Sequence, residues 1–233
     1  MKLPDWSRPW LAPLRSRGER MATDSPVATA LSELAGGTVS FVDAAALPAG
    51  EAYEAFIART GSVPTRDNPH DLFNGLMWLH RPDLKRRLNQ LQAAEIAARG
   101  IGPTRGALRD ALTLFDEHGG VWPDPPAPLA QALAARDWTA LFVTQRALWV
   151  GAGFEVFGHA LLEQLAVAPR KGLTAFVALG DPLAWSAERW AAKPFLPLPV
   201  LGIPGWWPGN DDPAFYADSK VFRARRLNAT NAP

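Results

Sequence analysis

The chain has 233 residues, of which 48% are hydrophobic and 20% are charged, and this balance excludes a disordered, solvated chain. Twenty-four Lys and Arg residues against 23 Asp and Glu residues leave a net charge of +1, so no overall field attracts the protein to nucleic acid or to an anionic membrane. The absence of cysteine excludes disulfides, cysteine-ligated zinc and thiol nucleophiles. Ten Trp and 22 Pro residues predict buried aromatic anchors joined by short helices and ordered connections.

Targeting and membrane signals are weak in this sequence. Pro4, Asp5, Arg8 and Pro9 interrupt the N-terminal stretch, so no signal-peptide hydrophobic segment is expected there. The longest nearly apolar run, 173–179, is far below the roughly 18–20 residues that span a bilayer. We therefore expect a bacterial-type cytoplasmic protein with no membrane partner.

The first half of the chain reads as short helices separated by breakers. An irregular arm over residues 1–20 has Trp6 and Trp10 as its anchors. The expected elements that follow are a helix over 26–34, a short strand over 39–42, and helices over 51–59, 69–80 and 82–99. The stretch VPTRDN, residues 63–68, is expected to be a turn. A further apolar helical stripe, Leu108 to Phe115, ends at the glycine pair 119–120.

The second half begins with a proline-rich stretch, 123–128, that is the expected hinge or linker. Helices are expected over 129–135, 138–149 and 154–167, and 173–179 suits a strand or a short buried helix. Beyond Asp181 the chain is apolar, rich in proline and aromatic, so we expect no helix there but an extended tail, 181–233, lying across the body. The predicted fold is mainly α: a single irregular helical domain over 1–233 with a few short strands.

The predicted helix 69–80 has two sharply different faces. Asn68 is a favourable N-cap, Pro69 suits the first helical position, and Asp71 suits the positive end of the helix dipole. One arc is apolar and consists of Leu72, Phe73, Leu76, Met77 and Leu79. The opposite arc consists of His70, Asp71, Asn74, Gly75 and Trp78. Because this second arc contains no Lys, Glu or Gln, it does not resemble an ordinary solvent face.

Two interpretations of the polar arc remain open. As a pocket wall, it holds His70 near a positive dipole end, which favours the neutral imidazole that a general base or a metal ligand needs. Asn74 would then orient substrate, Arg66 would hold an anion, and Asp67 and Trp78 would complete the substrate-binding side. As a buried seam between helices, Asp71 would only cap the helix and His70 would bond to backbone.

A second candidate pair lies on the predicted helix 154–167. His159 and Glu163 are one turn apart, with Glu155 nearby, on a helix whose other positions are mostly apolar. This spacing can place two ligands on one metal ion. It is equally typical of a hydrogen bond between the two side chains.

Three other polar clusters favour simpler interpretations. FDEHGG, residues 115–120, lacks the spacing of a calcium loop, so a helix that ends in a turn is expected. The polar residues around Tyr216 could bind a cation weakly but are more typical of a turn, and they are Asn210, Asp211, Asp212 and Asp218. The basic cluster Arg81, Lys85, Arg86 and Arg87 is typical of a solvated helix face. It would serve a phosphate-containing ligand if it bordered the wall that holds His70. It would serve nucleic acid only if it aligned with Arg105 and Arg109, which the net charge does not favour.

The common catalytic and nucleotide-binding motifs are missing. The sequence contains no phosphate-binding loop, no dinucleotide fingerprint, no His-Glu-x-x-His zinc motif and no serine nucleophile elbow. Composition and motifs together therefore assign no reaction class by themselves.

Four stretches carry a family resemblance: 47–92 with its HDLFN motif, 105–119, FGHALLEQL at 157–165, and 197–223 with its PGWW motif. They resemble a family of proteobacterial proteins known as domain of unknown function 3025, and the resemblance spans nearly the whole chain. In that family's pattern two histidines recur, which correspond to His70 and His159, whereas His80 and His118 fall where the family has other residues. The resemblance implies no activity, but it favours one shared site built from His70, Asp71, Asn74, His159 and Glu163.

The leading hypothesis is an enzyme-like pocket lined by segments 66–78 and 155–163. It would hydrolyse a small polar or phosphorylated substrate, with a divalent transition metal on His70, His159 and Glu163 and with Asp71 or Glu163 orienting a histidine. This requires the two histidine rings to lie roughly 4–7 Å apart. The alternative is a non-catalytic module that binds a protein partner through an exposed surface of Trp206, Trp207 and Tyr216.

Overall fold

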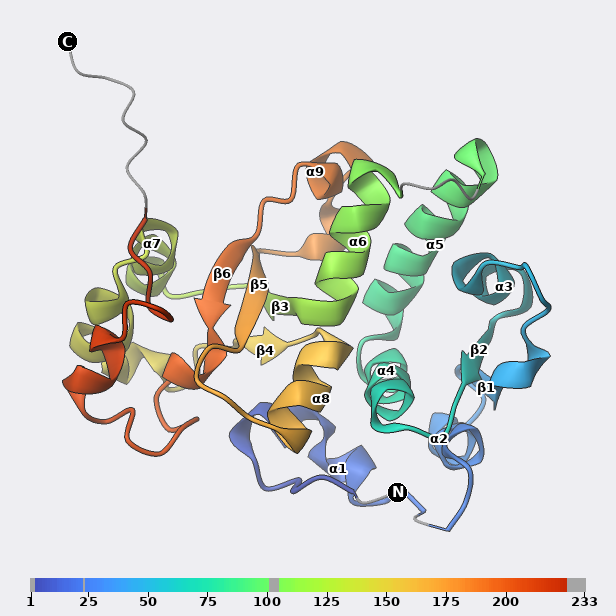
Figure 1. The fold of residues 1–233 in the computed structure, drawn as a ribbon, viewed down its shortest axis with the longest axis horizontal. Helices are drawn as coiled ribbons and strands as arrows, with labels where there is room; N and C mark the ends of the chain where they lie inside the picture. The colour runs from blue at the N-terminus through green and yellow to red at the C-terminus, as the bar shows by residue number, and fades with distance from the viewer. Residues whose placement is uncertain (1–2, 23, 101–104, 226–233) are drawn as a thin grey trace.

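The computed structural model describes residues 3–22, 24–100 and 105–225 (Figure 1). The fold is mainly helical, as predicted. The helices are α1 (Arg15–Gly18), α2 (Val27–Ala35), α3 (Tyr53–Thr60), α4 (Pro69–His80), α5 (Pro82–Arg99), α6 (Gly106–His118), α7 (Ala127–Ala135), α8 (His159–Val167) and α9 (Ala187–Ala191). The strands are β1 (Ser40–Asp43), β2 (Ser62–Thr65), β3 (Gly119–Trp122), β4 (Glu155–Val156), β5 (Thr174–Leu179) and β6 (Leu196–Pro199).

Two small sheets organise the helices. The larger has the order β4-β3-β5-β6, in which β3 and β5 run parallel and the outer strands pair antiparallel. The smaller pairs β1 with β2 in parallel, with Phe41 opposite Val63. Helices α4, α5 and α6 lie between the two sheets (Figure 1). The facing sides of α4, α5 and α6 therefore meet in the interior of the molecule.

Helix α4 is buried along nearly its whole length, which explains why its polar arc is not a solvent face. Its start follows the sequence signals: the Asn68 side chain accepts a bond of 2.8 Å from the Asp71 amide, and Pro69 occupies the first turn. Gly75 allows α2 to approach closely, because a Cβ atom there would lie 2.2 Å from Leu31 Cδ1. Helix α4 is thus packed on its apolar arc and partly on its polar arc.

Several boundary predictions are wrong, two of them because of pairing between distant segments. VPTRDN is not simply a turn, since its first three residues complete β2 against β1. The helix expected from residue 154 begins only at His159, because Glu155 and Val156 pair with β3 and the Gly158 amide donates to Gly119 O at 2.8 Å. The helix expected over 138–149 is broken into a π-helical turn, Ala140–Thr144, and a 3-10 turn, Arg146–Trp149.

The C-terminal segment is not extended throughout, so the prediction that no helix forms beyond Asp181 is wrong. Ser186 caps α9 by accepting a bond from the Arg189 amide at 3.3 Å, and Trp190 on this helix is fully buried. The rest of the described tail contains β6 and 3-10 turns, including Pro213–Ala217. The predicted tail end, 226–233, lies outside the described residues. The predicted hinge, 123–128, connects β3 to α7.

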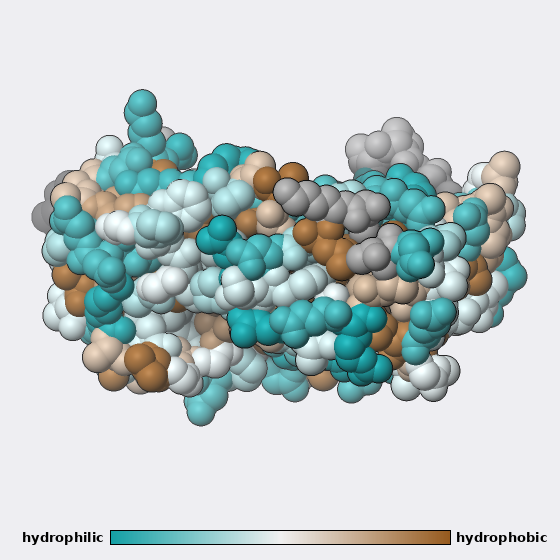
Figure 2. Space-filling view, turned by 90° about the horizontal axis from the view of Figure 1, so that it is seen from below, coloured by the Kyte–Doolittle hydropathy of each residue, from teal (hydrophilic) through white to brown (hydrophobic). Residues whose placement is uncertain are grey.

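The surface shows no large apolar face from the side drawn in Figure 2, where hydrophobic residues occur in small groups among hydrophilic ones. Over the described ranges, no helix has the length and apolar character needed to cross a membrane. Large hydrophobic side chains exposed within the same ranges are Leu148, Val150, Val167 and Leu183.

Candidate functional site

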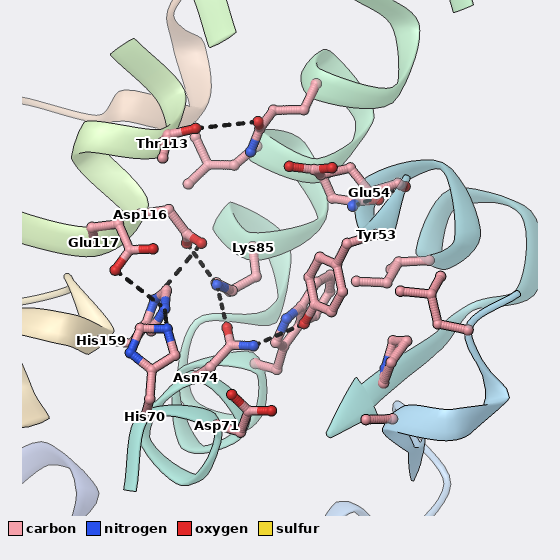
Figure 3. Close-up of a pocket in the computed structure, with 18 of the residues that line it drawn as sticks. Tyr53, Glu54, His70, Asp71, Asn74, Lys85, Thr113, Asp116, Glu117 and His159 are labelled. Carbon is pink, nitrogen blue, oxygen red and sulfur yellow. Dashed lines mark hydrogen bonds and ion pairs between the residues drawn. The ribbon is translucent and has the colours of Figure 1, made fainter. Parts of the chain in front are cut away.

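Two histidines from distant parts of the chain meet between α4 and α8. His70 lies in the first turn of α4, and His159 is the first residue of α8. Their Nε2 atoms are 3.1 Å apart and their ring centroids 4.6 Å apart, with the rings at 70° (Figure 3). The distance that the hypothesis required is therefore met. His159 is only 4% exposed whereas the His70 side chain is 34% exposed, so the contact joins a buried ring to a half-buried one.

The other nitrogen of each ring faces a carboxylate. His70 Nδ1 lies 3.0 Å from Glu163 Oε2, and His159 Nδ1 lies 3.7 Å from Asp116 Oδ2. The Glu163 carboxylate favours a proton on Nδ1 of His70 and so leaves its Nε2 unprotonated. His159 has carboxylate oxygens at similar distances from both of its nitrogens, with Asp116 3.7 Å from Nδ1 and Glu117 3.6 Å from Nε2. With the His159 proton on Nε2, the two rings share a hydrogen bond of 3.1 Å, and with that proton on Nδ1, both Nε2 lone pairs face one point at which a cation can bind. The arrangement is typical of a pair of metal-binding histidines.

A third ligand atom comes from the last turn of α6. Glu117 Oε2 is 3.6 Å from His159 Nε2, and one atom each of His70, Glu117 and His159 lie within 4.8 Å of one another. In tetrahedral coordination with bonds of about 2.0–2.1 Å, ligand atoms are about 3.3–3.4 Å apart. The distances of 3.1 Å between the two Nε2 atoms and 3.6 Å between His159 and Glu117 bracket that spacing, and all three ligand atoms lie within 4.8 Å of one another. Burial raises the pKa of the Glu117 carboxyl, so a neighbouring cation would stabilise its ionised form.

A buried lysine stands directly behind these residues. Lys85 on α5 is 4% exposed, and its Nζ lies 2.6 Å from Asp116 Oδ1 and 2.7 Å from Asn74 Oδ1. Burial alone would raise the pKa of Asp116, but the Lys85 ammonium outweighs it and holds that pKa below its ordinary value. Burial also lowers the pKa of His159 to about 3. The site thus combines an ionised Asp116 with a neutral imidazole.

The cluster opens into a pocket of about 430 Å³ between α3, α4, α5 and α6 (Figure 3). Polar residues dominate its wall beyond the histidines. They include Tyr53, Glu54, Arg66, Asp71, Asn74, Lys85, Asn89, Gln92, Arg105, Thr113 and Asp116. Burial raises the pKa of the Tyr53 hydroxyl, which therefore stays protonated. A small polar molecule would fit this volume and find hydrogen-bond partners on several sides.

Most residues predicted for the site do come together. His70, His159 and Glu163 form one hydrogen-bonded group, and Asn74 and Trp78 line the same pocket. Glu163 contacts Nδ1 of His70 rather than the shared point between the rings, so its position suits an orienting role rather than that of a metal ligand.

Asp71 and Arg66 form a tight pair at the edge of the pocket. The Asp71 carboxylate accepts bonds from the Arg66 amide at 2.7 Å and from its side chain at 3.0 and 2.9 Å. The Arg66 side chain nevertheless remains 65% exposed. The Asp71 carboxylate is therefore paired with Arg66, and over the described ranges it makes no hydrogen bond to either histidine.

Two polar residues expected near the site lie elsewhere. Asp67 accepts a bond of 2.7 Å from the Val27 amide and lines a separate hollow beside α2, so it does not reach the pocket of His70. Glu155 lies on β4, 3.0 Å from His80 Nε2 and 3.4 Å from Arg81 Nη1. Asp67 thus contacts the start of α2, and Glu155 joins β4 to the end of α4.

Sequence reasoning missed four residues of the site: Tyr53, Lys85, Asp116 and Glu117. The adjacent acids in FDEHGG were a usable signal, but they were interpreted as the end of a helix, which they also are. For Lys85 the sequence favours a solvated basic face and allows a ligand-binding role only if that face borders His70. The structure places Lys85 inward between α4 and α6, in the same pocket as His70. Its position next to Leu84 and Leu88, both buried, was the only local hint.

Comparison with known proteins identifies the family. The family model described as "Protein of unknown function (DUF3025)" matches residues 39–181 and 178–226, which together span most of the chain. The chain therefore belongs to this family, and the resemblance drawn from its HDLFN, FGHALLEQL and PGWW motifs is confirmed. The matched residues include every side chain of the cluster between α4, α6 and α8. No curated protein and no solved structure matches the chain.

Proposed function

We propose that this member of the DUF3025 family binds a divalent transition metal ion through His70, His159 and Glu117 and uses it to hydrolyse a small polar substrate in the adjoining pocket. One observation carries the proposal. Two imidazole Nε2 atoms lie 3.1 Å apart while both Nδ1 atoms face carboxylates, and Glu117 adds an oxygen beside them. Two histidines and one carboxylate leave a coordination position open, which is the pattern of catalytic rather than structural zinc sites.

The chemistry of such a site is well defined. His70, His159 and Glu117 would hold the ion, and a Zn²⁺ ion there would lower the pKa of its water to about 7 and so supply hydroxide at neutral pH. In hydrolysis the water oxygen bonds to the acyl or phosphoryl centre of the substrate, the bond to the leaving group breaks, and the leaving group takes up a proton. The protein's own contribution would be to align the two rings, His70 through Glu163 and His159 through Asp116, while burial keeps the His159 imidazole neutral by lowering its pKa.

The direct test is metal analysis of tag-free protein. We expect close to one transition-metal ion per chain in the wild type and loss of that metal in the His70→Ala, His159→Ala double variant. Glu117→Gln should lower metal content as well, because it removes the anionic ligand. His80→Ala is the matched control, since His80 bonds to Glu155 outside the cluster. A wild type that binds no metal on dialysis against Zn²⁺, Mn²⁺, Ni²⁺ or Co²⁺ would refute the proposal.

The alternative of an interaction module rested on an exposed aromatic surface in the tail. Tyr216 is 8% exposed, and Trp206 and Trp207 are half-buried against the core. The Tyr216 hydroxyl also donates to Gly202 O at 2.9 Å, so this hydrogen bond joins two parts of the C-terminal segment. These positions favour the pocket over the tail as the working surface.

A further inference from the structure

The hydrogen bonds around Lys85 fix the direction of donation along one wall of the pocket. An ammonium group carries three donors and no acceptor. Asn74 must therefore present Oδ1 to Lys85, at 2.7 Å, and Nδ2 to the Tyr53 hydroxyl oxygen, at 2.9 Å. Because Tyr53 accepts this bond, its own O–H hydrogen is left to donate to something else.

Tyr53 and Lys85 each keep one hydrogen-bond donor without an acceptor in the described part of the protein. Over the described ranges of the chain, the Tyr53 O–H has no acceptor, and Lys85 has used two of its three N–H groups, on Asn74 and Asp116. No acceptor takes the remaining N–H of Lys85 among the described residues, and Nζ lies 5.6 Å from the centroid of the Trp78 ring. Both side chains line the pocket, and Figure 3 shows Lys85 between Tyr53 and the two histidines. A buried donor without a partner costs free energy, which a ligand oxygen would recover.

The charges of the pocket indicate what kind of oxygen fits. Three cations, Arg66, Lys85 and Arg105, and four carboxylates, Glu54, Asp71, Asp116 and Glu117, line it. Asp71 and Asp116 are already paired with Arg66 and Lys85, and Glu117 belongs to the metal cluster. With a divalent ion bound, the lining therefore becomes net positive. An anionic acceptor makes stronger hydrogen bonds to such donors than a neutral one.

We propose that Tyr53 and Lys85 donate hydrogen bonds to an anionic oxygen of the substrate, in a phosphoryl or carboxylate group, beside the metal cluster. This inference rests on the proposed function for its location next to the reacting centre. It narrows the substrate class from small polar molecules to organic phosphates or carboxylates. It also assigns a substrate contact to Tyr53, whose neighbour Asn74 holds the hydroxyl oxygen in place.

The test is calorimetric titration of tag-free protein, of measured metal content, with inorganic phosphate and separately with acetate. We expect at least one of the two anions to bind the wild type, and Tyr53→Phe to weaken that binding about tenfold, because it removes a hydrogen bond to a charged acceptor. Phosphate alone binding indicates a phosphoryl group, and acetate alone indicates a carboxylate. The metal content of Tyr53→Phe should equal that of the wild type.

Tyr216→Phe is the matched control, since Tyr216 is the second of the two tyrosines and its hydroxyl bonds to Gly202 O and Asn210 O in the tail. Unchanged anion affinity in Tyr53→Phe, or no binding of either anion to metal-loaded wild type, would overturn the inference and leave the metal proposal standing. Anion binding that depends on Tyr53 in a protein that holds no metal would support the inference and refute the metal proposal.

Discussion

Lys85 Nζ lies 2.6 Å from Asp116 Oδ1, and this ion pair joins α5 to α6 in the interior beneath the histidines. The lysine is 4% exposed and the aspartate side chain 22%, so water screens the pair only on one side. Asp116 in turn directs its second oxygen toward His159. The pair thus links the packing of the three central helices to the orientation of a candidate metal ligand.

Removing the lysine should therefore be costly. Lys85→Met leaves Asp116 and Asn74 Oδ1 without their donor, and we expect the free energy of unfolding to fall by about 3 kcal/mol, as for other broken buried pairs. Chemical denaturation checks this. Arg99→Met, which breaks the exposed pair with Glu95 at 2.9 Å, is the control and should cost less than about 1 kcal/mol. Similar costs for the two variants would contradict the assignment of Lys85 to the interior.

Glu163 should act on the metal through His70. Glu163→Gln keeps the shape of the side chain but weakens its hold on the Nδ1 proton, so we expect metal affinity to fall about 10–100-fold, the usual loss for such an orienting carboxylate. Competition with a chromophoric chelator measures it. Glu188→Gln, at an exposed position of α9, should leave affinity unchanged. A complete loss of metal in Glu163→Gln would instead show that Glu163 is itself a ligand.

The bounds of α4 could be predicted from the sequence, whereas the roles of Asp116 and Glu117 on α6 could not. The bounds of α4 follow from Asn68, Pro69 and the apolar period, all of which act within the helix itself. His70 and His159 could be paired only through a family pattern, because 89 positions separate them. The choice of Glu117 over Glu163 as third ligand depends on β3 pairing with β4, which sets where α8 begins relative to α6. No local pattern encodes such pairing.

Asp67 should prove dispensable for the site. Its carboxylate holds the first amide of α2, at Val27, and not a pocket ligand. We expect Asp67→Ala to lower the free energy of unfolding by about 1 kcal/mol, as for loss of a helix cap, and to leave metal content unchanged. Thermal unfolding and metal analysis of the same sample check both parts. Metal loss without loss of stability would show that Asp67 acts in the site, as the sequence predicts, and not on α2.

Gly75 provides the sharpest test of how α4 is packed. A methyl group there would lie 2.2 Å from Leu31 Cδ1 and 3.1 Å from Cδ2, so the buried Leu31 side chain or α2 itself would have to shift. We expect Gly75→Ala to lower the free energy of unfolding by about 1–3 kcal/mol, even though alanine is intrinsically the better helix former. Chemical denaturation measures the change.

Two further variants test whether the contact with Leu31 is the cause of the loss of stability. Leu31→Ala in the Gly75→Ala background should make the second change less costly than it is alone, because the space that the methyl group needs is then open. Gly172→Ala, where a Cβ would meet only Val221 at 3.9 Å, should be close to neutral. If Gly75→Ala stabilises the protein, α2 does not pack closely against α4 at Gly75. The polar arc of α4, from His70 to Trp78, would then be open on the side that faces α2.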